Sequence, residues 1–380
     1  MISPSSSECY DSLVPPTSIH TVFIVGAGFS HYAGLPLQRE FTKAILSFKG
    51  KGPSKYIVEY LTKFVKGTFG PRLHPTDPTW PDLEDVFTCV DLSANSGHHL
   101  GQGYPPAQLR TVRRALITRI IWMLGQKYNK SAKRRDADWQ TFTNFLKTVN
   151  TSATAFVNLN WDVALEQRIT EIHRKIDILY GEGVTPADFP NSGNQICVRS
   201  VISPVFHVIK IHGSVNWLYC DNCREVFWFP PQESSRVASQ LLRSDDRKRI
   251  GYSKTVNQWS CHRCAKVSLG ARIATFSYRK ALEYPMFQTS WRAAELLLRD
   301  AKRWVFIGYS LPPADYEFKY LLKWVQLSRK NPPQLVLVAG GERELAEKTR
   351  DSYREFFGKN VTAHLGGLTP SVIDEITRIP

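Results

Sequence analysis

The sequence lacks the features of a membrane or secreted protein. It contains no run of about 18 consecutive apolar residues, the length that a membrane-spanning helix needs. Residues 1–18 are polar and contain proline, and they lack the apolar core of a secretion signal. We therefore expect residues 1–18 to be a disordered lead-in. We expect the protein to be soluble and cytoplasmic, without a membrane partner.

Cysteine is also scarce, with seven in 380 residues, and four of the seven fall in two C-x-x-C pairs. In a chain without a secretion signal, paired cysteines favour a metal site over disulfides. Four thiolates form the tetrahedral ligand set that structural zinc prefers, and they leave the metal no open position. The sequence therefore predicts one structural Zn²⁺ site, bound by Cys220, Cys223, Cys261 and Cys264.

Two nucleotide-related signatures are absent. No G-x-x-x-x-G-K-[ST] sequence occurs, and no tract interleaves base-stacking aromatic residues with Lys and Arg. The formal net charge is nevertheless +15, and the sequence pI is about 9.5. Such an excess suits a polyanionic partner, whether nucleic acid, an acidic protein or a phosphorylated cofactor. An ordinary basic surface explains it equally well.

Six short apolar runs alternate with helical patterns along the chain. They lie at residues 21–25, 153–157, 206–211, 304–307, 334–338 and 361–364. This alternation predicts an α/β fold, a Rossmann-like and mostly parallel sheet of about six strands covered on both faces. We expect one such domain over residues 19–380. It would carry a helical insertion at 49–150, with its arginines on a solvated face, and a small zinc-ribbon module at 215–270.

A glycine turn follows the first predicted strand directly, as Gly26-Ala27-Gly28-Phe29-Ser30. A strand, a glycine turn and a helix over 37–48 suit phosphate binding, because the backbone can approach a pyrophosphate closely. Tight turns also need glycine for backbone reasons alone. A Rossmann dehydrogenase needs a second strand ending in an acid about 20 residues further on. Residues 49–54 instead read as a loop, which disfavours hydride transfer.

Polar residues follow three further predicted strands. Asn160 and Asp162 come after the second strand, His212 after the third, and Gly308-Tyr309-Ser310 after the fourth, with Asp315 close behind. Open α/β sheets bind ligands at the carboxyl ends of their strands, which favours a site made by these residues. The alternatives are that Asp162 only caps the next helix and that His212 is structural.

These motifs, in this order, resemble those of the sirtuins. Gly26-Ala27-Gly28-Phe29-Ser30 with Gly34-Leu35-Pro36 resembles the sirtuin opening motif, Asn160-Trp161-Asp162 its Asn-x-Asp, Ile211-His212-Gly213-Ser214 its catalytic His-Gly, and the cysteine pairs its zinc module. The resemblance covers about residues 23–310. It implies an NAD-dependent enzyme.

Departures from the sirtuin pattern indicate a branch. Leu37-Gln38-Arg39 stands where sirtuin deacylases have Asp-Phe-Arg, and Gly308-Tyr309-Ser310-Leu311 replaces their Gly-Thr/Ser-Ser turn. Together with Leu83-Glu84-Asp85-Val86, these residues are more similar to the sirtuin-like NAD-consuming domains of prokaryotic antiphage systems. That resemblance implies an NAD hydrolase acting as a defence effector. Because most such domains lack a four-cysteine ribbon, NAD-dependent protein-lysine deacylation remains an alternative. A non-catalytic module that binds NAD or ADP-ribose is a third.

The resemblance also implies a role for each site residue. His212 would be the base, Asn160 would hold the ribose and the attacking water, and Asp162 would hold the carboxamide. The implied cofactor-binding residues are Gly26, Ala27, Gly28, Phe29, Ser30, Gly34, Asn160, Asp162, Gly308, Tyr309, Ser310 and Asp315. An enzyme that drains NAD would be lethal if always active. We therefore expect a homo-oligomer, or a complex with a separately encoded sensor such as an ATPase or a nucleic-acid-guided protein.

Overall fold

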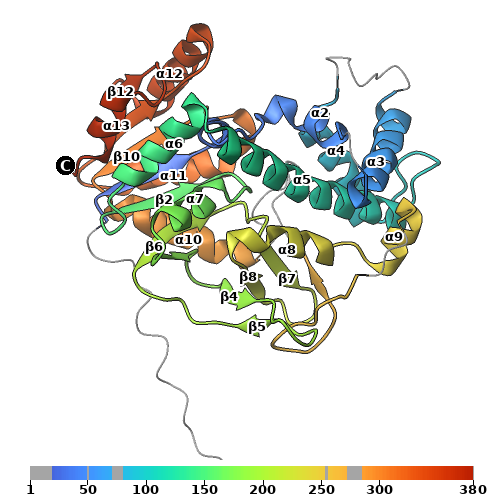
Figure 1. Ribbon diagram of the computed structural model, residues 1–380. Coiled ribbons are helices and arrows are strands. Elements are labelled where there is room, and N and C mark those ends of the chain that lie inside the picture. Colours follow the sequence, from blue (N-terminus) through green and yellow to red (C-terminus); the bar gives the residue numbers. More distant parts are fainter. Residues whose placement is uncertain (1–18, 49–50, 71–79, 253–255, 272–284, 380) are drawn as a thin grey trace, which may run out of the picture.

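The computed structural model describes residues 19–48, 51–70, 80–252, 256–271 and 285–379. The expected lead-in at residues 1–18 lies outside the described residues. At the centre is a seven-stranded sheet in the order β12-β11-β10-β1-β2-β6-β3, and all its neighbouring strands are parallel (Figure 1). The strands are β1 (Thr21–Val25), β2 (Thr154–Asn158), β3 (Asp177–Leu179), β6 (Val205–Lys210), β10 (Arg303–Ile307), β11 (Gln334–Val338) and β12 (Val361–His364).

The predicted α/β class with a parallel sheet is confirmed, and all six predicted runs are strands. The seventh strand, β3, was missed. It has three residues, one of them Asp177, and therefore lacks the length and apolar character of its neighbours. It forms the edge of the sheet beside β6.

Alternate residues of each strand face opposite layers. On one face, Phe23, Phe156 and Val305 share a core with helices α6 (Ala137–Thr148) and α7 (Ala164–Ile172). On the other, Ile24 and Trp304 pack with α10 (Pro285–Asp300), α11 (Tyr316–Ser328) and α12 (Arg343–Phe357). A last helix, α13 (Pro370–Thr377), belongs to the first face. The sheet is therefore covered on both sides, as a buried parallel sheet requires.

Between β1 and β2 the described residues are helical and contain no strand. The 3₁₀ turn η1 (Gln38–Glu40) and α2 (Phe41–Leu46) replace the single helix expected at 37–48, and α3 (Pro53–Phe69), α4 (Leu83–Ser96) and α5 (Pro106–Arg134) follow. These helices lie beside the sheet in Figure 1. None of the described helices combines the length and apolar character that a membrane span needs.

The expected solvated face for the arginines of α5 is wrong for Arg119, which is 1% exposed. Its Nε donates to the carbonyl of Ile45 at 2.9 Å, and its guanidinium lies 5.2 Å from the ring centre of Phe48. Burial lowers the pKa of Arg119 to about 10. Arg119 therefore fastens α5 to the end of α2. The helical spacing alone did not reveal this role.

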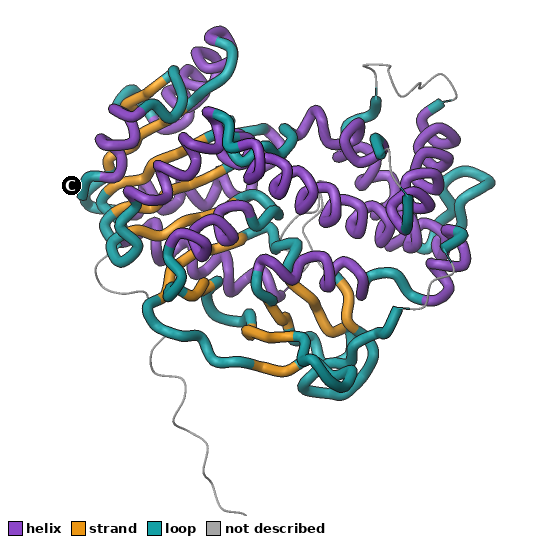
Figure 2. The backbone as a smooth tube through the Cα atoms, in the orientation of Figure 1, coloured by secondary structure: helices purple, strands orange, loops and turns teal. Residues whose placement is uncertain are grey.

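A second, five-stranded sheet lies beside the first, in the order β5-β4-β8-β7-β9. Its strands are β4 (Thr185–Asp188), β5 (Cys197–Val198), β7 (Trp217–Cys220), β8 (Val226–Trp228) and β9 (Leu269–Gly270). Figure 2 shows the two sheets as separate groups of strands. Helices α8 (Ser234–Gln240) and α9 (Ser244–Ile250) follow β8, and both contact α5. Because β4 and β5 precede residue 215, the small sheet also uses a segment outside the expected zinc module.

Candidate functional site

Four strands of the large sheet end at the same level. Val25 of β1 lies opposite both Ile307 of β10 and Asn158 of β2, and Asn158 lies opposite Lys210 of β6. The residues that follow each strand therefore meet at one edge. The chain leaves β1 for β2 on one side and later returns to β10 on the other. The edge above β1 is thus a topological switch point, where open α/β sheets bind ligands.

A cavity of about 160 Å³ lies at this edge. It brings together Asn160, Asp162 and His212, the residues expected to be catalytic. Of the expected cofactor-binding residues, it is also lined by Gly26, Ala27, Ser30, Gly308, Tyr309, Ser310 and Asp315. Segments that are far apart in the sequence therefore supply one cavity.

Three expected site residues do not line this cavity. Phe29 is 1% exposed, and its ring packs against Phe142 and Phe145 in the core. Gly28 approaches β10, since its N–H donates to the carbonyl of Gly308 at 2.9 Å. Gly34 lies against Ser131 of α5. The side chain of Phe29 and the two glycines therefore pack the turn against its neighbours on the side away from the cavity.

Asn160 connects the second strand to the glycine turn. Its Nδ2 donates to the carbonyl of Gly26 at 2.8 Å and to Oγ of Ser30 at 3.0 Å. Its own N–H donates to Oδ1 of Asn158 at 2.9 Å. Both ends of Asn160 are thus held, and the amide stands in the cavity with a fixed orientation.

Asp162 combines the two roles that the sequence left open. Its Oδ1 accepts a hydrogen bond from the N–H of Ala164 at 3.0 Å, which caps the start of α7. The same side chain is 7% exposed and lines the cavity. Capping and a place in the site are therefore compatible.

His212 is buried, with 8% of its surface exposed, and its Nδ1 lies 3.1 Å from the carbonyl of Leu159. A carbonyl oxygen can only accept, so this contact assigns the proton to Nδ1. Nε2 is then the acceptor nitrogen of the neutral ring. A histidine oriented in this way can take up a proton in the cavity.

Among the lining residues that the sequence analysis did not single out, Gln38 and Glu84 have side chains that could bind a polar ligand. Nε2 of Gln38 donates to Oε2 of Glu84 at 3.2 Å, across 46 positions of sequence. Glu84 lies in the first turn of α4. An acid there usually complements the helix dipole, and no local pattern distinguishes that role from a place in a cavity.

A second cavity, of about 300 Å³, adjoins the first. The two share Leu35, Leu124 and Asp162. The second lies among α5, α7 and the segment around Gln232 that leads into α8. Asp162 therefore stands at the boundary between the two cavities.

The four paired cysteines come together at the end of the small sheet. Their Sγ atoms all lie within 4.8 Å of one another, and Cys220–Cys264 and Cys223–Cys261 are each separated by 3.6 Å. A tetrahedral zinc with sulfur ligands at about 2.3 Å places its sulfurs about 3.8 Å apart. The cluster therefore fits structural Zn²⁺, and no disulfide joins these cysteines.

The two cysteine turns have the same backbone pattern. Cys220 N–H donates to the carbonyl of Glu225, and Cys261 N–H donates to that of Lys266, each at 2.9 Å. The residue after each C-x-x-C, Arg224 and Ala265, has a positive φ, 64° and 56° respectively. Two matching turns that face each other present four thiolates to one point. This supports a closed site of structural type.

Comparisons with known proteins give a likeness in structure only. No family model matches the sequence, and no curated protein matches it either. A structure described as the basis for the mechanism and regulation of Sir2 enzymes is 15% identical and has a TM-score of 0.41, covering 95% of this chain and 93% of that chain. A mutant Sir2 homologue with ADP-ribose is 13% identical, with a TM-score of 0.40 and coverages of 94% and 90%. A Sir2 homologue with NAD is 13% identical, with a TM-score of 0.39 and coverages of 94% and 88%.

These matches to solved Sir2 structures extend over nearly the whole length of the chain. At these TM-scores the likeness says nothing of function.

Proposed function

We propose that this protein hydrolyses NAD to nicotinamide and ADP-ribose. The observation that supports the proposal is the meeting of Asn160, Asp162 and His212 with the Gly26–Ser30 turn in one cavity at the carboxyl edge of the sheet. These are the positions that match the ordered sirtuin-type motifs. NAD is the substrate in this proposal, and Zn²⁺ is a structural ion held by the four cysteines.

The chemistry assigns one task to each group. Breaking the bond between nicotinamide and ribose builds oxocarbenium character at the ribose carbon. The bonding electron pair returns to the pyridinium nitrogen, so nicotinamide leaves as a neutral molecule. Water attacks the ribose carbon, and Nε2 of His212 takes its proton. Asn160 orients the ribose and the water, and Asp162 binds the carboxamide.

Turnover of the purified protein on NAD tests this proposal. Asn160→Ala and His212→Ala should each lower kcat by about 100-fold or more, the usual contribution of a positioned acid–base group. Matched controls are Asn95→Ala and His99→Ala, since both residues are exposed in the helical region away from the cavity. Release of ADP-ribose is followed with and without candidate activators. Full activity in both site variants would contradict the residue assignment.

NAD-dependent protein-lysine deacylation is the second candidate, and the four-cysteine cluster favours it. Its chemistry uses the same cavity, except that an acyl oxygen of the peptide attacks in place of water. Nicotinamide release would then require an acylated lysine peptide. Turnover without peptide, at a rate that peptide does not change, supports hydrolysis over deacylation. Tight NAD binding without turnover under any activating condition would instead indicate a non-catalytic module.

We further propose that the enzyme acts as a regulated effector in prokaryotic antiphage defence. The support is the similarity of Gly308-Tyr309-Ser310-Leu311 and the Leu83-Glu84-Asp85-Val86 helix to domains of that kind. Regulation would come from self-association or from a separately encoded sensor, and the net charge of +15 would favour a polyanionic partner or nucleic acid. Sizing the protein alone and after co-expression with neighbouring genes checks this. A strictly monomeric, fully active protein that is indifferent to every neighbour would contradict it.

A further inference from the structure

A fully buried lysine lies directly beneath the site and has no part in the roles described above. Lys210 is the last residue of β6, and only Ile211 separates it from His212. Its side chain is 0% exposed, and Nζ lies 3.1 Å from Oε1 of Glu166, which is also 0% exposed. Nζ also donates to the backbone carbonyl of Asp162.

Lys210 belongs to a set of contacts that holds the turn carrying Asn160. His212 binds the carbonyl of Leu159, and the N–H of Val215 donates to the carbonyl of Trp161 at 2.9 Å. Lys210 binds the next carbonyl, that of Asp162. The last residue of β6 and the segment after it thus bind the segment after β2 at three nearly consecutive carbonyls. The lysine supplies the charged contact, and charge-assisted hydrogen bonds are the stronger kind.

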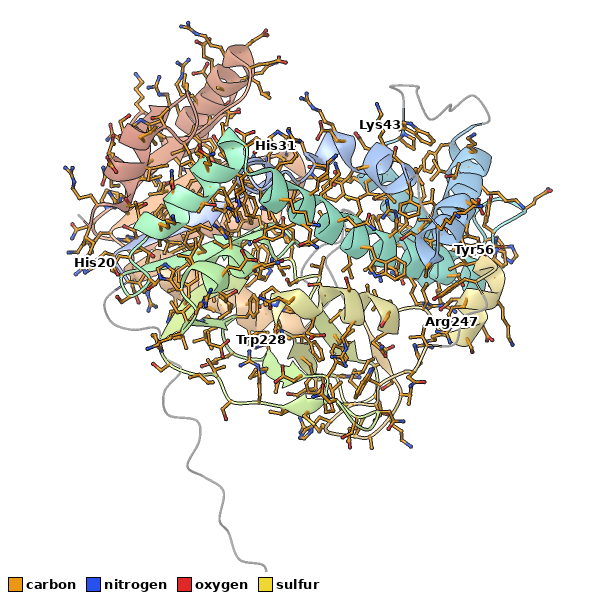
Figure 3. The ribbon with its side chains drawn as sticks, viewed as in Figure 1. His20, His31, Lys43, Tyr56, Trp228 and Arg247 are labelled. Carbon is orange, nitrogen blue, oxygen red and sulfur yellow. The ribbon has the colours of Figure 1, made fainter. Side chains whose placement is uncertain are left out.

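Glu166, whose carboxylate pairs with Lys210, also relates the turn after β2 to the small sheet. Burial raises the pKa of Glu166, and the Lys210 charge opposes that shift. Burial and the nearby Glu166 carboxylate raise the pKa of Tyr180 well above its ordinary value. Nδ2 of Asn216 donates to the Tyr180 hydroxyl at 3.2 Å and to the carbonyl of Phe229 at 2.6 Å. The Tyr180 ring packs edge-on against that of Trp228, labelled in Figure 3, with ring centres 5.1 Å apart.

A contribution to stability does not by itself explain why Lys210 and Glu166 form a buried ion pair. Removing two charges from water is costly, and well-packed neutral residues of similar volume often replace a buried ion pair without loss. The specific effect of Lys210 is to fix the Asp162 carbonyl. Asp162 has its own side chain in the cavity and lies two residues after Asn160. A shift of about 1 Å in such a turn can cost about 100-fold in rate.

We propose that Lys210 is a positioning residue for the reaction. Its ammonium sets Asn160 and Asp162 relative to His212, and Glu166 supplies the counter-charge that keeps the ammonium buried. The expected effect on rate rests on the proposed NAD hydrolysis. The expected effect on the order of the turn after β2 is independent of that proposal.

The test separates the charge balance from the contact with the carbonyl. Lys210→Met alone leaves the Glu166 carboxylate uncompensated and should lower the melting temperature strongly. The double variant Lys210→Met with Glu166→Gln removes both charges and should melt close to the wild type. Its kcat should nevertheless remain about 10- to 100-fold lower, with KM within about threefold of the wild type. A merely structural pair would regain activity together with stability.

Hydrogen exchange adds a readout that does not need turnover. Amides of residues 160–164 should exchange at least about tenfold faster in the double variant, with the remaining core unchanged. The exposed pair Lys55–Glu59, changed to Lys55→Met with Glu59→Gln, is the matched control and should alter neither rate nor exchange. Wild-type protein that binds but never turns over NAD would contradict the proposed function, and hydrogen exchange would still decide this inference. A double variant with wild-type kcat and wild-type exchange would overturn it.

Discussion

The cavity depends on one close contact between backbones. The N–H of Gly26 donates to the carbonyl of Ile307 at 3.1 Å, and that of Gly28 donates to the carbonyl of Gly308 at 2.9 Å. Gly308 has a φ of +62°, and a Cβ added there would lie 2.2 Å from the backbone nitrogen of Phe29. Any side chain at position 308 would therefore move the turn after β1 away from β10.

We predict that Gly308→Ala is severely destabilising and abolishes ligand binding at the cavity. The positive φ costs about 1 to 3 kcal/mol, and forcing the two backbones apart costs about 1 to 3 kcal/mol more. Gly341→Ala is the matched control, because Gly341 has a φ of +90° and open space around its Cβ position. It should show only the cost of the positive φ. Urea unfolding measures both variants. Equal losses in the two would contradict the close-contact explanation.

Single residues differed in how far the sequence could assign them. That Asn160, Asp162 and His212 lie at one edge could be predicted, because each follows an apolar strand and parallel strands share one carboxyl edge. Their roles in catalysis stay a prediction. Lys210 could not be distinguished from a strand-end lysine exposed to solvent. Its partner Glu166 lies in another element, and the pairing of β6 with β2 exists only in the folded sheet.

At the scale of elements, a buried carboxylate of the short helix α9 binds the long helix α5, beside a second contact in which Arg249 donates to Ala107 and Thr111. Asp246 is 1% exposed and accepts hydrogen bonds from both Nε and Nη2 of Arg114, each at 2.7 Å, and from Oγ1 of Thr111 at 2.6 Å. Burial alone would raise the pKa of Asp246, but the Arg114 and Thr111 hydrogen bonds and the Arg114 charge lower it below its ordinary value of 3.8. The bidentate pair therefore joins the helical region to the segment between the cysteine pairs.

We predict that Asp246→Asn costs about 2 to 3 kcal/mol of unfolding free energy at pH 7, the usual range for losing charged hydrogen bonds. Because the folded pKa of Asp246 is depressed, its contribution is fully present above pH 3.8 and is lost as the pH falls through the folded pKa. The difference between wild type and variant should therefore shrink below that pH. Asp245→Asn, an exposed neighbour on α9, is the control and should change little. A difference that stays constant down to pH 2 would contradict this prediction.

Long, buried strands could be predicted from the sequence, whereas most of the short or exposed strands could not. The central strands β1, β2 and β10 of the large sheet are buried runs, because both faces are covered, and such runs are visible in a sequence. The small sheet has strands of two to four residues, and its edge strand β5 is exposed. The pairing of its strands depends on the paired cysteines and on distant partners such as β4. The cysteines could therefore be recognised in the sequence, whereas the strands could not.

At the scale of the whole molecule, one continuous core joins the large sheet to the helical region and to the small sheet. Phe156 of the large sheet, Phe87 and Ile120 of the helical region, and Trp217 and Leu269 of the small sheet all belong to the same buried cluster. Phe87 packs edge-on against Trp161, which lines the cavity, with ring centres 6.3 Å apart. Because these contacts share one core, loss of order in any one region removes buried contacts from the others.

The last prediction follows from this shared core and concerns the metal. We expect one zinc per molecule, and Cys261→Ser with Cys264→Ser should abolish it in metal analysis. Cys89→Ser with Cys197→Ser is the matched control, since neither cysteine belongs to the cluster. Metal binding is coupled to folding, and for a single cooperative unit of this size a loss of at least about 3 kcal/mol lowers the melting temperature by about 4 °C or more. The N–H of Val215, just before the small sheet, donates to the carbonyl of Trp161 in the cavity. On heating, the native tryptophan fluorescence and NAD binding should therefore be lost in a single transition. A small sheet that melts first while NAD binding persists, or full zinc occupancy in the double variant, would show that the cluster is not the structural centre proposed here.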